Sequence, residues 1–247
     1  MALSKCIIIS DLHLSLKRPE LVQAFESFIN KIEADTRLII AGDFFDFFVG
    51  VDKEDTLTKR LKHDFEELKK RGIDTSFQCG NRDYLVTRKS AAFFNMQLLP
   101  QSYVLDTHQG KALLIHGDIL CANDRTFMRF RALCLNPVAR AVFFMLPLSV
   151  RKRIGQKVRS DSASLEASRK TDESMFDLTS GLAGKLLQEH HCDILIHGHF
   201  HVFGSHKDEN TPRLKRLALG AWGNNYSFVK IDENSLELIE KPLKDLL

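Results

Sequence analysis

The sequence predicts an α/β fold in which a mixed sheet, or two packed sheets, is flanked by helices. Short apolar runs typical of buried strands alternate with stretches of helical periodicity. Polar motifs follow directly after several of these runs, as expected where ligands gather at the carboxyl ends of strands. Beyond residue 204 the pattern changes to strands separated by turn residues, which favours a mixed sheet or two packed sheets over a doubly wound one.

Length and composition are those of one soluble globular domain, expected to span residues 1–247. The net charge of +3 gives no argument for nucleic-acid binding. The five cysteines are scattered and form no CxxC pair, so the sequence suggests no disulfide framework and fits a reducing cytosol. The N-terminus lacks a signal-peptide pattern, and the longest apolar run, residues 141–150, is far shorter than the roughly 20 residues of a membrane span. A cytoplasmic location is therefore expected.

The expected elements follow one another along the chain. Buried strands are predicted at residues 6–9, 38–41, 75–78, 112–115 and 194–196, and later strands at residues 213–219 and 226–231. A first helix follows Pro19, where apolar residues recur at helical spacing behind a favourable first-turn proline. A second spans residues 57–70, and a third covers residues 175–186.

Residues 122–170 are predicted to form an inserted helical cap. Between residues 125 and 159 there are nine basic residues and no acidic ones, interleaved with large apolar side chains. An ordinary amphipathic hairpin with a solvated basic face has the same composition. The alternative is a surface that binds the acyl chains and phosphate of a lipid, and the motifs described next favour it.

Short polar motifs are distributed over the whole chain, each after a predicted strand. They are Asp-x-His at 11–13, Gly-Asp-x-x-Asp at 42–46, Gly-Asn-x-Asp at 80–83, His-Gly-Asp at 116–118 and Gly-His-x-His at 198–201. One such motif alone is weak evidence, but this ordered combination is rare by chance. Carboxylate, imidazole and amide donors without thiolates indicate Mn²⁺, Fe or Zn²⁺ in a catalytic rather than a structural site.

The motifs predict a centre with two metal ions and seven ligands. The donors of the first ion would be Asp11, His13 and His201, and those of the second Asn81, His116 and His199. Asp43 would bridge the ions with one oxygen on each. Two ions about 3.5–4 Å apart can activate a water and stabilise both oxygens of a phosphoryl transfer. The residues predicted to be catalytic are Asp43, Asn81, His116 and His199.

The ordered motifs resemble those of the calcineurin-like metallophosphoesterase superfamily, whose fold is two packed mixed sheets flanked by helices. The resemblance spans nearly the whole chain. Further segments resemble the UDP-2,3-diacylglucosamine hydrolase family of lipid A biosynthesis in Gram-negative bacteria; they are residues 98–100, 116–124, 130–131, 146–148, 150–154 and 219–222. That family cleaves the pyrophosphate bond of its substrate by water attack on the α-phosphorus. The products are UMP and 2,3-diacylglucosamine 1-phosphate, known as lipid X.

The resemblance also implies cofactors, partners and substrate contacts. Two Mn²⁺ ions are expected, with Fe or Zn²⁺ as alternatives, and the partners are an acylated UDP-sugar and the cytoplasmic face of the inner membrane, with a monomer favoured. The implied substrate contacts are Asn81, Arg82, Asp124, Ser162, Glu166, Arg169, Lys170 and His199. Glu166 and Arg169 stand where the family has asparagine and lysine. A carboxylate near a substrate phosphate is repulsive, so either the alignment shifts here or the headgroup contacts differ.

Two other functions stay open at this point. The residues at 166 and 169 motivate a related metallophosphodiesterase or nucleotide hydrolase with a different substrate. A non-catalytic lipid- or protein-binding module on the same fold is the other alternative, and the complete ligand set argues against it. Cys79 and Cys121 flank the motifs among apolar neighbours and are interpreted as small buried residues.

Overall fold

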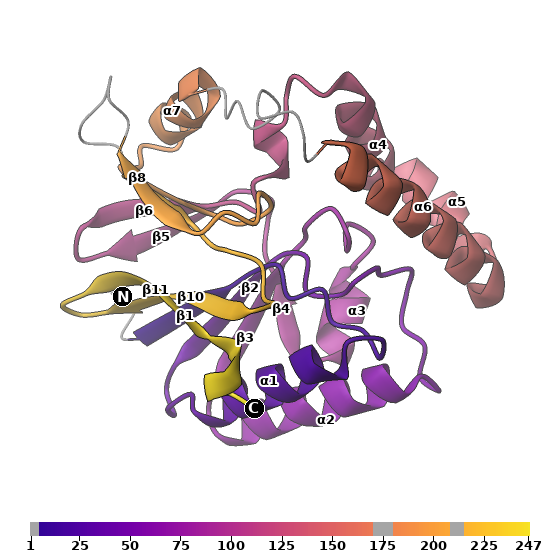
Figure 1. Ribbon diagram of the computed structural model, residues 1–247, viewed down its shortest axis with the longest axis horizontal. Helices are drawn as coiled ribbons and strands as arrows, with labels where there is room; N and C mark the ends of the chain where they lie inside the picture. The colour runs from indigo at the N-terminus through magenta and orange to yellow at the C-terminus, as the bar shows by residue number, and fades with distance from the viewer. Residues whose placement is uncertain (1–4, 170–179, 208–214) are drawn as a thin grey trace.

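The computed structural model describes residues 5–169, 180–207 and 215–247. Two mixed sheets lie face to face between helices (Figure 1). Helices α1 (Pro19–Asn30) and α2 (Thr56–Lys70) cover one sheet, and α7 (Ser180–Glu189) covers the other. This arrangement confirms the predicted fold class.

The first sheet has six strands in the order β11-β10-β1-β2-β3-β4. Four of them are parallel: β1 (Lys5–Ile9), β2 (Arg37–Ala41), β3 (Asp74–Gln78) and β4 (Met96–Leu98). The other two, β10 (Asn225–Asp232) and β11 (Leu236–Pro242), extend the sheet in antiparallel fashion beside β1. The parallel strands bring the ends of β1, β2 and β3 to one edge.

The second sheet has five strands in the order β5-β6-β7-β9-β8. Its central strands β6 (Gly110–Leu114), β7 (Ile194–His197) and β9 (Lys215–Ala218) run parallel. Antiparallel strands β5 (Tyr103–Thr107) and β8 (Gly204–Lys207) form its edges. β4, β5, β8 and β11 are not expected from the sequence, because short or edge strands carry little of the continuous apolar signal of buried ones.

The two long predicted helices form where their sequences specify ends. Pro19 begins α1, and the Asp55 side chain caps α2 by accepting a hydrogen bond from the Thr58 N–H at 2.9 Å. Gly72 follows α2 with a φ of +74°, a left-handed conformation that ends helices readily. The third predicted helix is α7 in its described part; Met175 and Leu178 lie outside the described residues. The short helix α3 (Arg88–Phe93) precedes β4.

Three apolar cores hold the layers together. The largest joins α1 and α2 to the first sheet through buried residues that include Phe25, Phe65 and Phe77. A second core fills the space between the two sheets, for example with Ile39 of β2 and Ile196 of β7. A third packs α7 on the outer face of the second sheet. The apolar cores fill the layers, and the polar side chains of the motifs lie at the strand ends.

Three consecutive helices stand at one side of the layers (Figure 1): α4 (Arg125–Leu135), α5 (Pro137–Met145) and α6 (Leu148–Arg169). Asp124 caps α4 through the Phe127 N–H at 2.9 Å, and Asn136 caps α5 through two backbone N–H groups. We call these three helices the cap. Among the helices of the described ranges, none is both long and apolar enough to cross a membrane.

Candidate metal centre

The loops that carry the motifs are joined by backbone hydrogen bonds. The Asp11 N–H donates to the Gly42 carbonyl at 3.1 Å, and the His13 N–H to the Asp43 carbonyl at 2.9 Å. From the second sheet, the His199 N–H donates to the carboxylate of Asp11 at 3.0 Å. Motifs nearly 190 positions apart in the sequence are thereby fixed against one another, as the parallel strand ends predict.

A first group of potential metal donors consists of Asp11, His13 and His201, whose ligand atoms lie within 4.8 Å of one another. The Nε2 atoms of the two imidazoles face each other at 3.1 Å. His201 Nε2 lies 3.5 Å from Asp11 Oδ1. Asp11 is fully buried and His201 is exposed, so this half of the centre opens to solvent.

A second group consists of Asp43, His116 and His199, also within 4.8 Å. The Asn81 side chain joins it, with Oδ1 3.0 Å from His116 Nε2 and 2.7 Å from His199 Nδ1. On its other side, His116 Nδ1 lies 2.9 Å from the Ala41 carbonyl, to which it donates; Nε2 is thereby left unprotonated in the neutral ring. Seven oxygen- and nitrogen-donating residues in two adjacent groups fit a pair of divalent transition-metal ions.

The backbone at these donors is strained. Five of the seven adopt a left-handed conformation that non-glycine residues rarely take, with φ values of +58° at Asp11, +50° at His13, +52° at Asp43, +69° at His199 and +58° at His201. Each such residue costs on the order of 1–3 kcal/mol and persists only where the surrounding structure fixes it. Sequence patterns do not reveal this feature, although it is typical of functional sites.

Two glycines make the close approach of the loops possible. Gly42 has a φ of +90°, and a Cβ atom there would lie 2.5 Å from His116 Nδ1. A Cβ atom at Gly198 would collide with the carboxylate of Asp11 and the hydroxyl of Ser10. The glycines of the Gly-Asp and Gly-His motifs therefore serve packing, because no side chain fits at either position.

Burial and neighbouring charges shift the pKa values of the donors. Burial lowers the pKa of His13 and of His199 to about 3, which keeps both imidazoles neutral, the form that binds metals. Burial raises the pKa of Asp43 to about 7. Burial opposes protonation of His116, yet the nearby Asp43 and other carboxylates raise its pKa to about 9. Binding of a cation at the second group would therefore release protons.

Buried polar side chains support the donors. Asp83 accepts hydrogen bonds from the backbone N–H groups of Gly80 at 2.7 Å and Phe44 at 2.9 Å, and so holds the loops of Asn81 and Asp43 together. The Ser10 hydroxyl donates to Asp11 Oδ2 at 2.6 Å. Ser10 was not among the predicted site residues, although its place directly before the Asp-x-His motif is a usable signal.

Asp118 of the His-Gly-Asp motif joins the core to the cap. Its carboxylate accepts hydrogen bonds from the Tyr84 hydroxyl and from Arg131 Nε of α4, the latter at 2.5 Å. Arg131 also donates to the side chain of Gln101 at 3.0 Å. Tyr84 and Arg131 were not among the predicted site residues, because pairing between distant segments leaves no local pattern.

Five of the nine basic residues between positions 125 and 159 hold the cap to the core. Arg140 donates to the Val86 carbonyl at 2.9 Å, and Arg159 pairs with Asp46 at 2.8 Å. The other three are Arg131 with Asp118, Arg151 with the Val49 carbonyl and Lys152 with Asp52. These five residues already have partners in the core. The expectation that the basic residues bind a ligand therefore applies mainly to the other four.

The implied substrate contacts are distributed unevenly. Asn81 and His199 lie in the second donor group. Arg82 is buried beside it, with its backbone N–H donating to Asp43 Oδ1 at 2.8 Å, and Asp124 caps α4. Three further contacts belong to α6, but the side chains of Ser162, Glu166 and Arg169 lie outside the described part of the structure. Lys170 lies outside the described residues.

The two cysteines beside the motifs differ from each other. Cys79 is buried, as expected. Cys121 is only half-buried, and its Sγ lies 3.4 Å from His199 Nε2. The interpretation of Cys121 as a small buried residue was wrong. The loop that follows His116 places its side chain against the imidazole of His199, in the Gly-His-x-His motif, where it is partly exposed.

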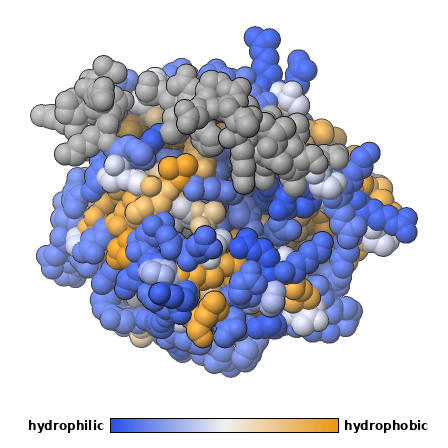
Figure 2. Space-filling model, viewed as in Figure 1, coloured by the Kyte–Doolittle hydropathy of each residue, from blue (hydrophilic) through white to orange (hydrophobic). Residues whose placement is uncertain are grey.

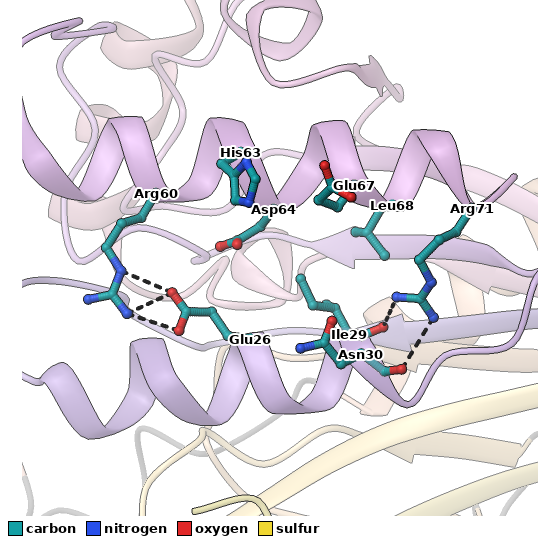
Figure 3. A pocket seen from close by; sticks show the side chains of 9 residues that line it. All are labelled: Glu26, Ile29, Asn30, Arg60, His63, Asp64, Glu67, Leu68 and Arg71. Atoms are coloured by element: carbon teal, nitrogen blue, oxygen red, sulfur yellow. Dashed lines mark hydrogen bonds and ion pairs between the residues drawn. The ribbon is translucent and has the colours of Figure 1, made fainter.

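A surface hollow of about 380 Å³ lies away from these motifs, between α1 and α2 (Figure 3). None of the described residues that line it is a predicted site residue. Arg60 and Glu26 form an ion pair across it at 2.7 Å, while Asp64 points into it with Oδ2 buried and without a hydrogen-bond partner among the described residues.

Comparisons with known proteins agree with this geometry. Residues 4–203 match the model of the family described as "Calcineurin-like phosphoesterase". A UDP-2,3-diacylglucosamine hydrolase from Tolumonas auensis is 35% identical over 242 residues, which cover 96% of this chain and 97% of that protein. Proteins of the same name from Haemophilus influenzae (36% identical, 92% and 94% covered) and Vibrio cholerae (33% identical, 96% and 97% covered) are also similar.

Proposed function

The chain belongs to the calcineurin-like phosphoesterase family, and from this premise we propose that it hydrolyses the pyrophosphate bond of UDP-2,3-diacylglucosamine. The products would be UMP and 2,3-diacylglucosamine 1-phosphate, and the reaction a step of lipid A biosynthesis. The observation that carries the proposal is the convergence of two donor groups at the strand ends, in a chain similar over nearly its whole length to hydrolases of that name.

Two Mn²⁺ ions are the proposed cofactors. Asp11, His13 and His201 would hold one ion; Asn81, His116 and His199 would hold the other; and Asp43 would contact both. When bound, the ions supply positive charge that lowers the pKa of an attacking water and offsets the charge of the phosphoryl group. Mixed carboxylate, imidazole and amide donors support Mn²⁺, with Fe or Zn²⁺ compatible with the same set.

The residues of the chain would orient the reaction at the α-phosphorus. The strained backbone and the bonds from Ser10 and Asp83 fix the donors before any ligand arrives, so little reorganisation accompanies the reaction. Arg82 is buried, directly follows Asn81 in the chain and donates its backbone N–H to Asp43. Its positive charge suits an anionic phosphate bound at the second donor group. Asn81 and His199, which belong to the same group, would also contact the substrate.

Incubation with Mn²⁺ and UDP-2,3-diacylglucosamine in H₂¹⁸O tests the proposal. We expect UMP, with ¹⁸O in its phosphate, because water would attack the α-phosphorus. Asp43→Ala should abolish release, while Asp106→Ala, at an exposed position on β5, should retain it. Protein that holds metal but releases no UMP would contradict the substrate assignment. Equal turnover of UDP-glucose would favour a nucleotide hydrolase indifferent to acyl chains.

We also propose that the cap binds the acyl chains and attaches the protein to the cytoplasmic face of the inner membrane. Apolar side chains on α4 and α5 are exposed to solvent: Leu133 by 60%, Val138 by 70%, Val142 by 58% and Met145 by 84%. Figure 2 shows apolar surface at the right edge of the molecule, on the side of the cap in Figure 1. The cap sequence from 125 to 159 has no acidic residue that would repel anionic headgroups.

Flotation with vesicles that contain phosphatidylglycerol tests the attachment. We expect the protein to float with these vesicles, and Val138→Asp with Met145→Asp to reduce the bound fraction about tenfold or more, because the apolar area entering the lipid is lost. Val104→Asp, at an exposed apolar position on β5, is the matched control and should bind normally. Equal binding of the two variants would contradict attachment through the cap.

A further inference from the structure

The imidazole of His199 is enclosed by side chains from several motifs. Asn81 Oδ1 lies 2.7 Å from Nδ1, and Cys121 Sγ lies 3.4 Å from Nε2. The rings of Phe127 and Phe200 lie against the imidazole, with centroid distances of 5.6 Å and 5.1 Å. These contacts define which ring nitrogen faces the donor group and which faces away.

The two histidines of the second donor group use opposite nitrogens. His116 presents Nε2 to Asn81 and donates from Nδ1 to the Ala41 carbonyl at 2.9 Å. His199 presents Nδ1 to Asn81, and its Nε2 meets the Cys121 sulfur. In each ring the nitrogen that faces away from the group has a polar partner, an oxygen for His116 and a sulfur for His199.

We propose that Cys121 is a positioning residue for His199. Its sulfur accepts the Nε2–H bond, so that Nδ1 is left unprotonated and directed at a metal ion. The inference rests on the metal-dependent hydrolysis proposed above and deepens it. An imidazole that binds a metal through one nitrogen usually donates the other N–H to a carboxylate, carbonyl or water, which fixes its tautomer and orientation. Here a thiol takes that place.

The loop around Cys121 is built to hold the sulfur in position. The 3-10 helix η1 (Asp118–Leu120) precedes it, and the Cys121 N–H donates to the Asp118 carbonyl at 3.1 Å. Leu120 is buried, and Asp118 is fixed by Tyr84 and Arg131. Cys121 Sγ meets Nε2, while Nδ1 is the nitrogen that faces Asn81 and the donor group, so the sulfur would act on the imidazole.

Metal binding of full-length variants tests this role without any substrate. Metal-free protein is titrated with Mn²⁺, and unbound Mn²⁺ is followed by electron paramagnetic resonance. We expect Cys121→Ala to weaken one of the two sites by about 10–100-fold, the range for lost partners of metal ligands. Cys121→Ser, whose hydroxyl can accept the same bond, should stay within about threefold of the parent. Cys134→Ala, a half-buried cysteine of α4, is the matched control and should bind normally.

A second measurement reports the tautomer directly. In the Zn²⁺-loaded parent, long-range ¹H–¹⁵N spectra should show His199 protonated at Nε2, and Cys121→Ala should broaden or shift that signal while circular dichroism stays unchanged. Unaltered affinity and an unaltered His199 signal in Cys121→Ala would overturn the proposal. Equal losses in Cys121→Ala and Cys121→Ser would also overturn it, since a hydrogen-bond acceptor would then not suffice. Intact metal binding without UMP release would instead count against the proposed reaction alone.

Discussion

The ion pair between Arg131 of α4 and Asp118 of the His-Gly-Asp motif offers a quantitative test of how the cap is joined to the core. The two side chains are 14% and 3% exposed, and Arg131 Nε lies 2.5 Å from Asp118 Oδ2. Tyr84 and Arg131 both donate to the Asp118 carboxylate. Arg131→Met removes the cation, so that of these two donors only the Tyr84 hydroxyl still binds the buried carboxylate. Breaking a buried pair in this way typically costs 3–5 kcal/mol.

Because Arg131 is partly exposed, we expect the lower end, about 3 kcal/mol. For a chain of this length that corresponds to a decrease in Tm of about 6–12 °C. Differential scanning calorimetry measures it. Asp118→Asn combined with Arg131→Met should recover much of the loss, since the neutral amide still accepts the Tyr84 bond and no charge stays buried.

Lys152→Met is the matched control, because it removes another bond between the cap and the core. The Lys152 side chain is 45% exposed in its pair with Asp52, and exposed pairs contribute about 1 kcal/mol or less. A Tm decrease for Arg131→Met no larger than that of Lys152→Met would refute the assignment of a buried, stabilising pair.

Three further predictions concern other parts of the molecule. Gly198→Ala should lower UMP release about 100-fold or more, because its Cβ would displace the Asp11 carboxylate; bound metal measured in parallel should fall too. Burial raises the pKa of Asp64 to about 6, and the charge of Glu26 is the next contribution. The folded state therefore binds more protons than the unfolded state, and stability falls as the pH rises from about 4 to 6. Asp64→Asn should flatten this dependence and, after a discount for partial exposure, add about 1 kcal/mol at pH 7 in urea denaturation; an unchanged slope would contradict the shift. Phe65→Ala, in the core between α2 and the first sheet, should cost about 3–5 kcal/mol in the same assay, and a loss below 1 kcal/mol would show that the core repacks.

The sequence alone determined the layered α/β fold and the order of its main elements. Apolar runs such as residues 38–41 must be buried on both faces, Pro19 marks the start of α1, and Gly72 marks the end of α2. The motifs could be located for a similar reason. A polar residue directly after a buried strand lies at the strand end, where parallel strands bring their loops together.

Short edge strands were less accessible to sequence reasoning. β4 (Met-Gln-Leu) and β8 (Gly-Ser-His-Lys) lack the continuous apolar run by which β7, also of four residues, could be predicted. The basic residues of the cap were visible, but their partners were not. A guanidinium looks the same in sequence whether it faces solvent, a phosphate or a buried carboxylate such as Asp118.

What the sequence determined is therefore the kind of chemistry, because residue types and their spacing after strands are local properties of the chain. The contacts between particular atoms depend on the folded chain: His199 directs Nδ1 to Asn81 and Nε2 to Cys121, and Arg131 pairs with Asp118. Such contacts depend on side-chain directions and on left-handed backbone at Asp11 and His199, which arise only when loops from both sheets pack against one another.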